Sequence, residues 1–344
     1  MTAAGRDPFP SVEPLRPGLT SVPVPLPSSS LGHVFVYVFE SDRGVYLVDA
    51  GWNTDEAYGA LDAGLASAGY AMGDVQGVLV THVHPDHYGL AGRIREASGA
   101  WIALHPADAE LLRHRGIEPA DLLARVGTAM RAMGAPPVEL EAMESALAMF
   151  GPPADVTLPD VLIDDGERPD VPGWDLSAVW TPGHTPGHLC FWEPRHRLLL
   201  TGDHVLPRIT PNVSVNAQTD GDPLGDFLRS LDRLDGYRPD EVLPAHEHRF
   251  EGLHARLDEL RRHHDARFRE VLVAIRHGNT TAWDIASHMS WSRGWDEIEG
   301  FMRRAAVGEA LAHLRALESR GVVTEMPGEP SHWSLTDAAG DIAG

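Results

Sequence analysis

The chain has 344 residues, 43% of them hydrophobic, and a formal net charge of −22. This length suits one large domain plus a small one, and the hydrophobic content excludes a globally disordered chain. No run of about 18 apolar residues exists to span a membrane, and all 28 basic residues are arginine, which excludes chemistry that needs a lysine Schiff base.

The first thirty residues predict an irregular lead-in, because they are rich in Pro and Ser. They lack the basic segment and apolar segment of a secretory signal. Cys190 is the single cysteine and lies in an apolar stretch, so it predicts a buried thiol without an intramolecular disulfide. Both features favour a cytoplasmic protein.

The next hundred residues alternate between strand and helix patterns. Apolar alternation predicts strands and a spacing of four residues predicts helices. The predicted strands cover 34–40, 45–49, 77–80 and 101–104, and the predicted helices cover 54–68 and 88–98. This order indicates a layered α/β domain.

Residues 106–150 interrupt that pattern, because they are rich in Ala, Leu and Met and show no strand periodicity. They predict two or three helices, broken near Gly116 and again at 134–137. Two interpretations stay open: helices that pack in the core, or a lid over a substrate pocket.

Strand patterns return from 156 to 244 and give way to helical patterns from Ala255. Helices are predicted at 282–288 and 299–319 after a first long helix, and strands at 322–326 and 332–336 predict a hairpin. Three helices and a hairpin outline a winged helix. We therefore predict a catalytic domain at 1–253 and a C-terminal domain at 254–344.

A dense cluster of chemistry-bearing residues follows the predicted strand at 77–80. His82, His84, Asp86 and His87 fall within six residues. On such a turn, His82 and His84 can point to one metal ion, while Asp86 and His87 point to a second. Imidazole nitrogen and carboxylate oxygen suit zinc, with Fe or Mn as alternatives. This spacing favours a metal site over a solvated loop.

Three later segments each place a candidate ligand directly after a predicted strand. His184 follows 176–180, Asp203 follows 198–200 and His246 follows 242–243. Loops at one edge of a rigid sheet are where sites are usually assembled. The repeated arrangement therefore predicts that these side chains meet the earlier cluster.

The motif set resembles the metallo-β-lactamase superfamily over roughly residues 20–250. The resemblance implies a four-layer αββα sandwich and two divalent metal ions. It also implies that His82, His84 and His184 hold the first ion, that Asp86, His87 and His246 hold the second, and that Asp203 bridges both. Asp49, in Leu47-Val48-Asp49-Ala50-Gly51, matches a family motif whose aspartate supports the ligands.

Details of the motifs indicate which branches of the superfamily the chain resembles. The stretch from Gly183 to His188 is similar to the glyoxalase II-like group, and an aspartate at 203 stands where the main zinc β-lactamases have cysteine. The predicted winged helix resembles the lactamase-β-like-protein branch, which includes endoribonucleases. His84 stands where the oxygen-reducing flavodiiron members have glutamate, which argues against that branch.

The resemblance implies hydrolysis by a hydroxide held between two metal ions. Asp86 is the candidate that orients this nucleophile and passes its proton to the leaving group. The expected substrate is a small acyl compound: a thioester, ester or lactone. Arg208, just past Asp203, is the candidate for binding a substrate carboxylate.

Two other functions stay open: an endoribonuclease, and a regulator that senses a ligand and binds DNA. Residues 1–250 hold 17 arginines against 35 acidic residues, a balance of −18 that repels polyanions. Nucleic acid is therefore not the default partner, and a homodimer formed through apolar helix faces is an alternative role for the C-terminal region.

The remaining histidines and the adjacent arginines predict no further site. His188, His204 and His248 are expected to play structural roles, and the pair at 263–264 is expected on the surface. The pair at 303–304 is expected on a solvated face, because its neighbourhood is close to charge-neutral.

Overall fold

Strand β3 (His33–Ser41) points its side chains alternately toward two different buried layers. Its valines pack with helix α1 (Asp55–Ser67) in one buried cluster, and its aromatic side chains pack against a second sheet in another. Successive side chains of a strand point to opposite faces, so β3 is buried on both. The computed structural model describes residues 9–27, 31–113, 119–141, 157–215 and 221–337.

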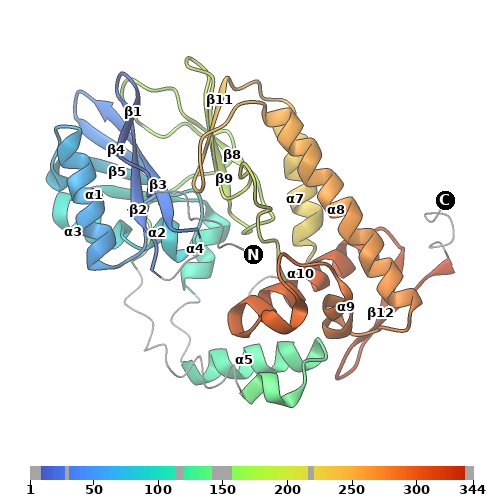
Figure 1. Cartoon of the computed structure of the whole chain (residues 1–344). Helices are drawn as coiled ribbons and strands as arrows, with labels where there is room; N and C mark the ends of the chain where they lie inside the picture. Colours follow the sequence, from blue (N-terminus) through green and yellow to red (C-terminus); the bar gives the residue numbers. More distant parts are fainter. Residues whose placement is uncertain (1–8, 28–30, 114–118, 142–156, 216–220, 338–344) are drawn as a thin grey trace.

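Two sheets face each other across the buried cluster that contains Phe35, Phe39 and Phe191 (Figure 1). The first has strand order β1-β2-β3-β4-β5-β6-β7, antiparallel up to β4 and parallel from β4 onward. Its other strands are β1 (Glu13–Arg16), β2 (Leu19–Pro25), β4 (Gly44–Val48), β5 (Val75–Leu79), β6 (Trp101–Leu104) and β7 (Val161–Leu162). The second has order β11-β10-β9-β8, formed by β8 (Ser177–Trp180), β9 (Leu189–Glu193), β10 (Leu198–Gly202) and β11 (Glu241–Pro244).

Helices cover the outer face of each sheet. The outer face of the first sheet packs against α1 and α3 (Ala91–Ser98), and that of the second packs against α7 (Pro223–Leu234) and α8 (Leu253–Arg276). The layers therefore run helix, sheet, sheet, helix, as the predicted αββα order requires. The shorter elements are α2 (Pro85–Tyr88), α4 (Pro106–Arg113) and the 3₁₀ turn η1 (Met72–Asp74).

The C-terminal part contains three helices and a hairpin, in the predicted order. Beyond α8 these are α9 (Ala282–His288), the 3₁₀ turn η3 (Trp295–Glu297), α10 (Gly300–Ser319), β12 (Val323–Met326) and β13 (His332–Leu335). Thr281 caps α9, because its side chain accepts the backbone N–H of Asp284. One buried apolar cluster includes residues of the second sheet, of α7 and of the C-terminal helices α8, α9 and α10. Apolar packing therefore crosses the predicted boundary at residue 253.

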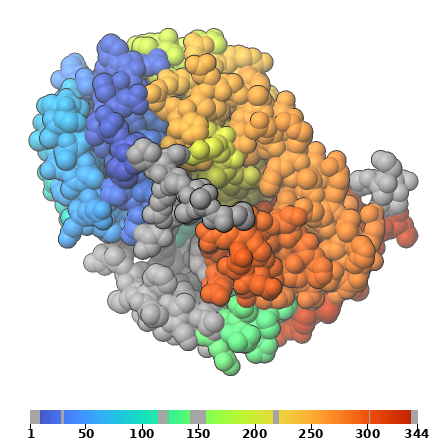
Figure 2. All heavy atoms as spheres, viewed as in Figure 1, coloured from blue at the N-terminus to red at the C-terminus, as the bar shows by residue number. Residues whose placement is uncertain are grey.

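Helix α5 (Pro119–Ala132) belongs to this C-terminal packing as well. Val126, Met130 and Met133 are buried in the same cluster, and the backbone N–H of Trp283 donates to the carbonyl of Met133. Figure 2 shows the green atoms of this segment against the orange C-terminal helices. The described part of the predicted insertion is helical, as expected, and residues 114–118 and 142–150 of it lie outside the described residues.

Three local features differ from the sequence prediction. The lead-in contains strands β1 and β2; Pro23 and Pro25 lack the N–H of a strand residue, yet β2 pairs with β3 along its whole length. No helix was predicted at 223–234, where α7 lies, although its cap Asp222 and Pro223 at the first position are helix-start signals. The helix predicted at 88–98 is present as α3 over 91–98, and the short helix α2 precedes it.

Two predicted surface positions are not on the surface. His264 is buried and its Nδ1 lies 3.2 Å from Nε2 of His313. Arg303 has a side chain only 14% exposed and forms an ion pair with Glu139. Tertiary contacts that no local pattern reveals explain both errors. Among the described residues no helix is long and apolar enough to cross a bilayer.

Candidate metal centre

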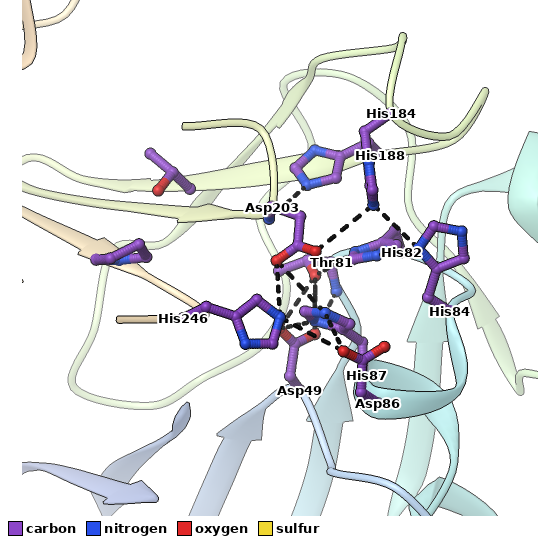
Figure 3. A network of polar contacts seen from close by, with 12 residues as sticks. Asp49, Thr81, His82, His84, Asp86, His87, His184, His188, Asp203 and His246 are labelled. Carbon is purple, nitrogen blue, oxygen red and sulfur yellow. Dashed lines mark hydrogen bonds and ion pairs between the residues drawn. The ribbon is translucent and has the colours of Figure 1, made fainter. Parts of the chain in front are cut away.

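Five strand ends deliver polar side chains to the same edge of the two sheets (Figure 3). Asp49 follows β4, the segment from Thr81 to His87 follows β5, and His184 follows β8. Asp203 follows β10, and His246 follows β11. The structure thus brings together all seven predicted ligands and Asp49, although they span almost two hundred residues of sequence.

Three imidazoles form the first cluster. Nδ1 of His84 lies 3.0 Å from Nε2 of His82 and 3.0 Å from Nε2 of His184. These three nitrogen atoms can hold one metal ion, because each residue offers a ligand atom within 4.8 Å of the others.

A second cluster consists of Asp86, His87 and His246. Oδ2 of Asp86 lies 3.6 Å from Nε2 of His87 and 3.4 Å from Nε2 of His246. These atoms also satisfy the distances for a shared metal ion. Two imidazoles and one carboxylate form a donor set that suits zinc, iron or manganese.

Asp203 lies between the two clusters. Its Oδ1 is 3.5 Å from Nε2 of His87 and 3.2 Å from Nε2 of His246, while its Oδ2 is 3.6 Å from Nε2 of His184. The carboxylate therefore turns one oxygen toward each cluster. Asp203 also completes a third candidate group with His82 and His87.

Hydrogen bonds orient the rings so that one nitrogen of each faces the cluster. Nδ1 of His184 lies 2.7 Å from the carbonyl oxygen of Asn212, and Nδ1 of His246 lies 2.8 Å from that of His33. Nδ1 of His87 lies 2.8 Å from Oδ2 of Asp49. An N–H at each Nδ1 leaves the Nε2 lone pair free for a metal ion.

Asp49 also anchors the loop that carries the first ligands. Its Oδ1 accepts the backbone N–H of Thr81 at 2.8 Å and the Thr81 hydroxyl at 2.9 Å. The residue is 2% exposed and adopts a φ of 65°, a left-handed conformation that Asp and Asn tolerate better than most residues.

The buried polar atoms at the centre fit a bound cation. Nε2 of His87, Nε2 of His246 and Oδ1 of Asp203 are buried without a hydrogen-bond partner in the described structure. Leaving such atoms unpaired costs free energy, so a cluster of them that faces one point needs a further group. A divalent cation accepts both nitrogen lone pairs and carboxylate oxygens, and the donor set fits it.

The electrostatics of the two clusters differ. Burial lowers the pKa of His84 to about 3 and lowers that of His184, so both rings stay neutral. Burial opposes protonation of His246 too, but Asp203 and Asp86 raise its pKa to about 10. Burial would raise the pKa of Asp86, yet His87 and His246 lower it to about 2. The carboxylates of the second cluster thus favour positive charge beside them, which a bound cation would supply in place of the proton on His246.

Three further histidines near the motifs have separate surroundings. His188 is buried; its Nε2 accepts the backbone N–H of Asp203 at 3.2 Å, and its Nδ1 lies 2.9 Å from the Thr181 hydroxyl. His204 is buried beside Phe227, with ring centroids 4.6 Å apart. His248 is exposed. His188 thus holds the backbone at Asp203.

Arg208 does not stand alone beside the centre. Its Nε donates to Oε1 of Glu247 at 2.9 Å, and its own backbone N–H and that of Ile209 donate to Oε2 of Glu247. Glu247 directly follows the candidate ligand His246, so this carboxylate ties the loop after Asp203 to the loop of His246. The Arg208 side chain remains 60% exposed.

Sequence reasoning missed Asp108, which lies in the first turn of α4 and is fully buried. Its carboxylate accepts hydrogen bonds from the loops of both His84 and His184. An acidic residue in a first helical turn is common, so the sequence offered no signal that singles it out.

Comparisons with known proteins point to one family. The family described as the metallo-beta-lactamase superfamily matches residues 30–246. A "Probable metallo-hydrolase YqjP" of Bacillus subtilis is 27% identical over 325 residues, covering 88% of this chain and 93% of its own. A metallo-beta-lactamase family protein from Thermus thermophilus is 34% identical with a TM-score of 0.77, covering 94% of this chain and 100% of its own. A beta-lactamase domain protein from Burkholderia ambifaria has a TM-score of 0.81 at 27% identity, with 97% of each chain covered.

Proposed function

The chain belongs to the metallo-β-lactamase superfamily of hydrolases, and on that premise we propose that it hydrolyses a small acyl compound at a two-metal centre. The observation that carries the proposal is the position of Asp203, whose two oxygens face two separate ligand clusters. We propose His82, His84 and His184 for one ion, and Asp86, His87 and His246 for the other. Zinc is the first choice for both ions, and Fe or Mn are the alternatives.

The two ions, when bound, would polarise the acyl carbonyl and lower the pKa of a water molecule so that hydroxide is available near pH 7. The protein's own part is to hold the reacting groups and move a proton. The carboxylate of Asp86 is ionised, since its pKa is about 2, and it stands at the second cluster. We assign to it the proton that leaves the nucleophile and reaches the leaving group.

We infer the substrate class from the charge of the chain and from one arginine near the centre. Residues 1–250 carry a balance of −18, from 17 arginines and 35 acidic residues, which disfavours a polynucleotide. Arg208 remains the candidate for a single substrate carboxylate, because its side chain is largely exposed even while it pairs with Glu247. A thioester, ester or lactone with one carboxylate suits this arrangement.

An endoribonuclease is the second candidate, favoured by one observation. Three helices and a hairpin at the C-terminus match the outline of a winged helix, which resembles the ribonuclease-containing branch. Against it, Arg303 pairs with Glu139 instead of facing solvent. We therefore propose that the C-terminal region serves packing or dimerisation, with a ligand-sensing regulator as the remaining alternative.

The segment at 106–150 is proposed to wall the substrate pocket in part. Its first turn reaches the ligand loops through Asp108, while α5 packs on the C-terminal helices. A segment fixed at both of these places can limit the size of the acyl group. This proposal concerns only the described residues 106–113 and 119–141.

Metal content and a substrate panel test the proposal together. Wild type should bind close to two zinc ions per chain and hydrolyse at least one thioester, ester or lactone. Asp203→Asn should lose the second equivalent and on the order of 10²-fold or more in rate, because several kcal/mol of metal-assisted stabilisation are removed. Glu193→Gln is the matched control, since Glu193 is a fully buried carboxylate on β9 outside the two clusters.

Two outcomes would overturn this assignment. Wild type that takes up no zinc or manganese would exclude the two-metal centre. Wild type that leaves all acyl substrates intact but cleaves single-stranded RNA, with Asp203→Asn inactive, would replace acyl hydrolysis by the ribonuclease function.

A further inference from the structure

Asp108 connects the two loops that supply the first ligand cluster. Its Oδ2 accepts the backbone N–H of Val83 at 2.8 Å, and Val83 lies between His82 and His84. The same oxygen accepts the hydroxyl of Thr185 at 2.8 Å, and Oδ1 accepts the backbone N–H of Gly187 at 2.6 Å. One carboxylate thus holds the loop of His84 and the loop of His184.

The approach of α4 to the second of these loops is too close for a larger residue. A Cβ at Gly187 would lie 2.6 Å from the backbone nitrogen of Asp108 and 2.8 Å from its Cβ. Backbone atoms of a helix cannot move aside cheaply, so glycine is needed for this contact. The close fit fixes the position of the carboxylate relative to the loop.

The strand end before α4 adds a second connection to the same loop. The ring of His105 stacks on Trp180 with centroids 5.3 Å apart and an interplanar angle of 6°. Nε1 of Trp180 in turn donates to the carbonyl of Pro186 at 2.9 Å. Residues 105–108 are therefore joined to the loop that follows His184 in two ways, directly through Asp108 and indirectly through Trp180.

We propose that Asp108 is a positioning residue that sets the spacing of the three imidazoles of His82, His84 and His184, and so determines the metal affinity of that cluster. Asp108 does not touch the ion. The inference rests on the proposed two-metal function, and concerns the cluster that lacks a carboxylate of its own. Because the nitrogen atoms come from two different loops, their relative position depends on what joins the loops.

A backbone hydrogen bond also joins these loops, from the N–H of Leu189 to the carbonyl of Thr81 at 2.8 Å. That bond lies where the loops leave their strands, whereas Asp108 acts at Val83, Thr185 and Gly187. Removing the carboxylate should therefore leave the sheets intact and loosen the part of each loop that carries the ligands.

The test is zinc binding by the full-length protein, measured by competition with a chromophoric chelator. Asp108→Asn should weaken one of the two zinc equivalents by about 10- to 100-fold and leave the other within about twofold, as expected for a residue that supports ligands. Co²⁺ in place of zinc gives an absorption spectrum for the three-imidazole cluster, and this spectrum should change in the variant. Glu193→Gln is the matched control, because it also removes a buried charge that accepts backbone N–H groups, here those of His196 and Asp175.

Thr185→Val provides a second variant that leaves the carboxylate in place and removes the hydrogen bond from Thr185 to Oδ2 of Asp108. It should weaken the same zinc equivalent by a smaller factor, and it decides the matter if Asp108→Asn does not fold. Two unchanged equivalents in a folded variant, or equal weakening of both, would refute the positioning role. A wild type without zinc would instead refute the proposed function, so the two failures are distinguishable.

Discussion

Replacing Asp49 by Asn removes one charge from the centre with little change in shape. The left-handed φ of 65° at this position suits Asn as well as Asp, so the backbone should keep its course. The amide can still accept through one oxygen, and the two contacts from Thr81 to Oδ1 can persist. The other oxygen becomes an NH₂ group that faces Nδ1 of His87, formerly 2.8 Å from the carboxylate.

The new NH₂ group and the N–H at Nδ1 of His87 are then two buried donors that face each other. The cost of leaving them unpaired sets the size of the loss in stability. An unpaired buried donor costs about 1–3 kcal/mol in the free energy of unfolding. His87 also loses the partner that fixes its tautomer, and such changes typically weaken metal affinity by about 10- to 100-fold. We therefore expect the loss in zinc affinity at the cluster of Asp86, His87 and His246.

The pH dependence of the metal-free protein gives a second measurement. Burial lowers the pKa of His87, but Asp49 first and then Asp86 and Asp203 raise it well above its usual value. The stability from this raised pKa is fully present below about pH 6.5 and is lost as the pH rises through the folded-state pKa. The difference between wild type and Asp49→Asn should therefore be largest at mildly acidic pH and shrink in alkali.

Chelator competition and urea unfolding at several pH values measure these effects. Glu193→Gln serves as control, because it should lose stability without losing zinc affinity. An Asp49→Asn protein that holds both zinc ions as tightly as wild type, with an unchanged free energy of unfolding, would refute the role assigned to Asp49.

Three further predictions follow from the packing. Gly187→Ala should lower the free energy of unfolding by about 1–3 kcal/mol through overpacking against Asp108, whereas Gly59→Ala, in open space on α1, should raise it slightly; urea unfolding that gives the same change for both would contradict the close contact. Burial lowers the pKa of His313 to about 3, so the metal-free protein should lose stability as the pH falls from about 6.5 toward 3, and His313→Gln should flatten this loss in acid titrations followed by circular dichroism. Burial raises the pKa of the Cys190 thiol to about 12, so a thiol reagent should label it only after unfolding, and rapid labelling of the native protein would show the site to be open.

The ligand residues were predictable because each lies directly after a strand with a strong apolar pattern. A strand end fixes where the next side chain stands, so His184, Asp203 and His246 needed only the assumption of a shared sheet edge. The layered fold was predictable for a related reason, since residues 34–40 and 45–49 read as strands without any knowledge of their neighbours. Whether all seven positions bind metal remains a prediction.

Residues whose role depends on a distant partner were not predictable. Asp108 matters because α4 meets loops near residues 83 and 187, and no local pattern brings those segments together. His264 is buried because α10 places His313 beside it. The strand β2 was hidden by its prolines, Pro23 and Pro25, which lie beyond the residues of β2 that pair with β1, where only the pairing with β3 continues.

The shared apolar cluster of the second sheet, α5, α7 and the C-terminal helices has a consequence for cooperativity. The backbone N–H of Val215 donates to the carbonyl of Gly308 in α10, and the nearby Asn212 orients His184. Unfolding of the C-terminal helices would therefore strip one face of the second sheet and release a ligand loop at the same time. We therefore expect that a chain cut at residue 253 would not yield an autonomous enzyme, because the cut would remove the apolar partners of the second sheet and of α7.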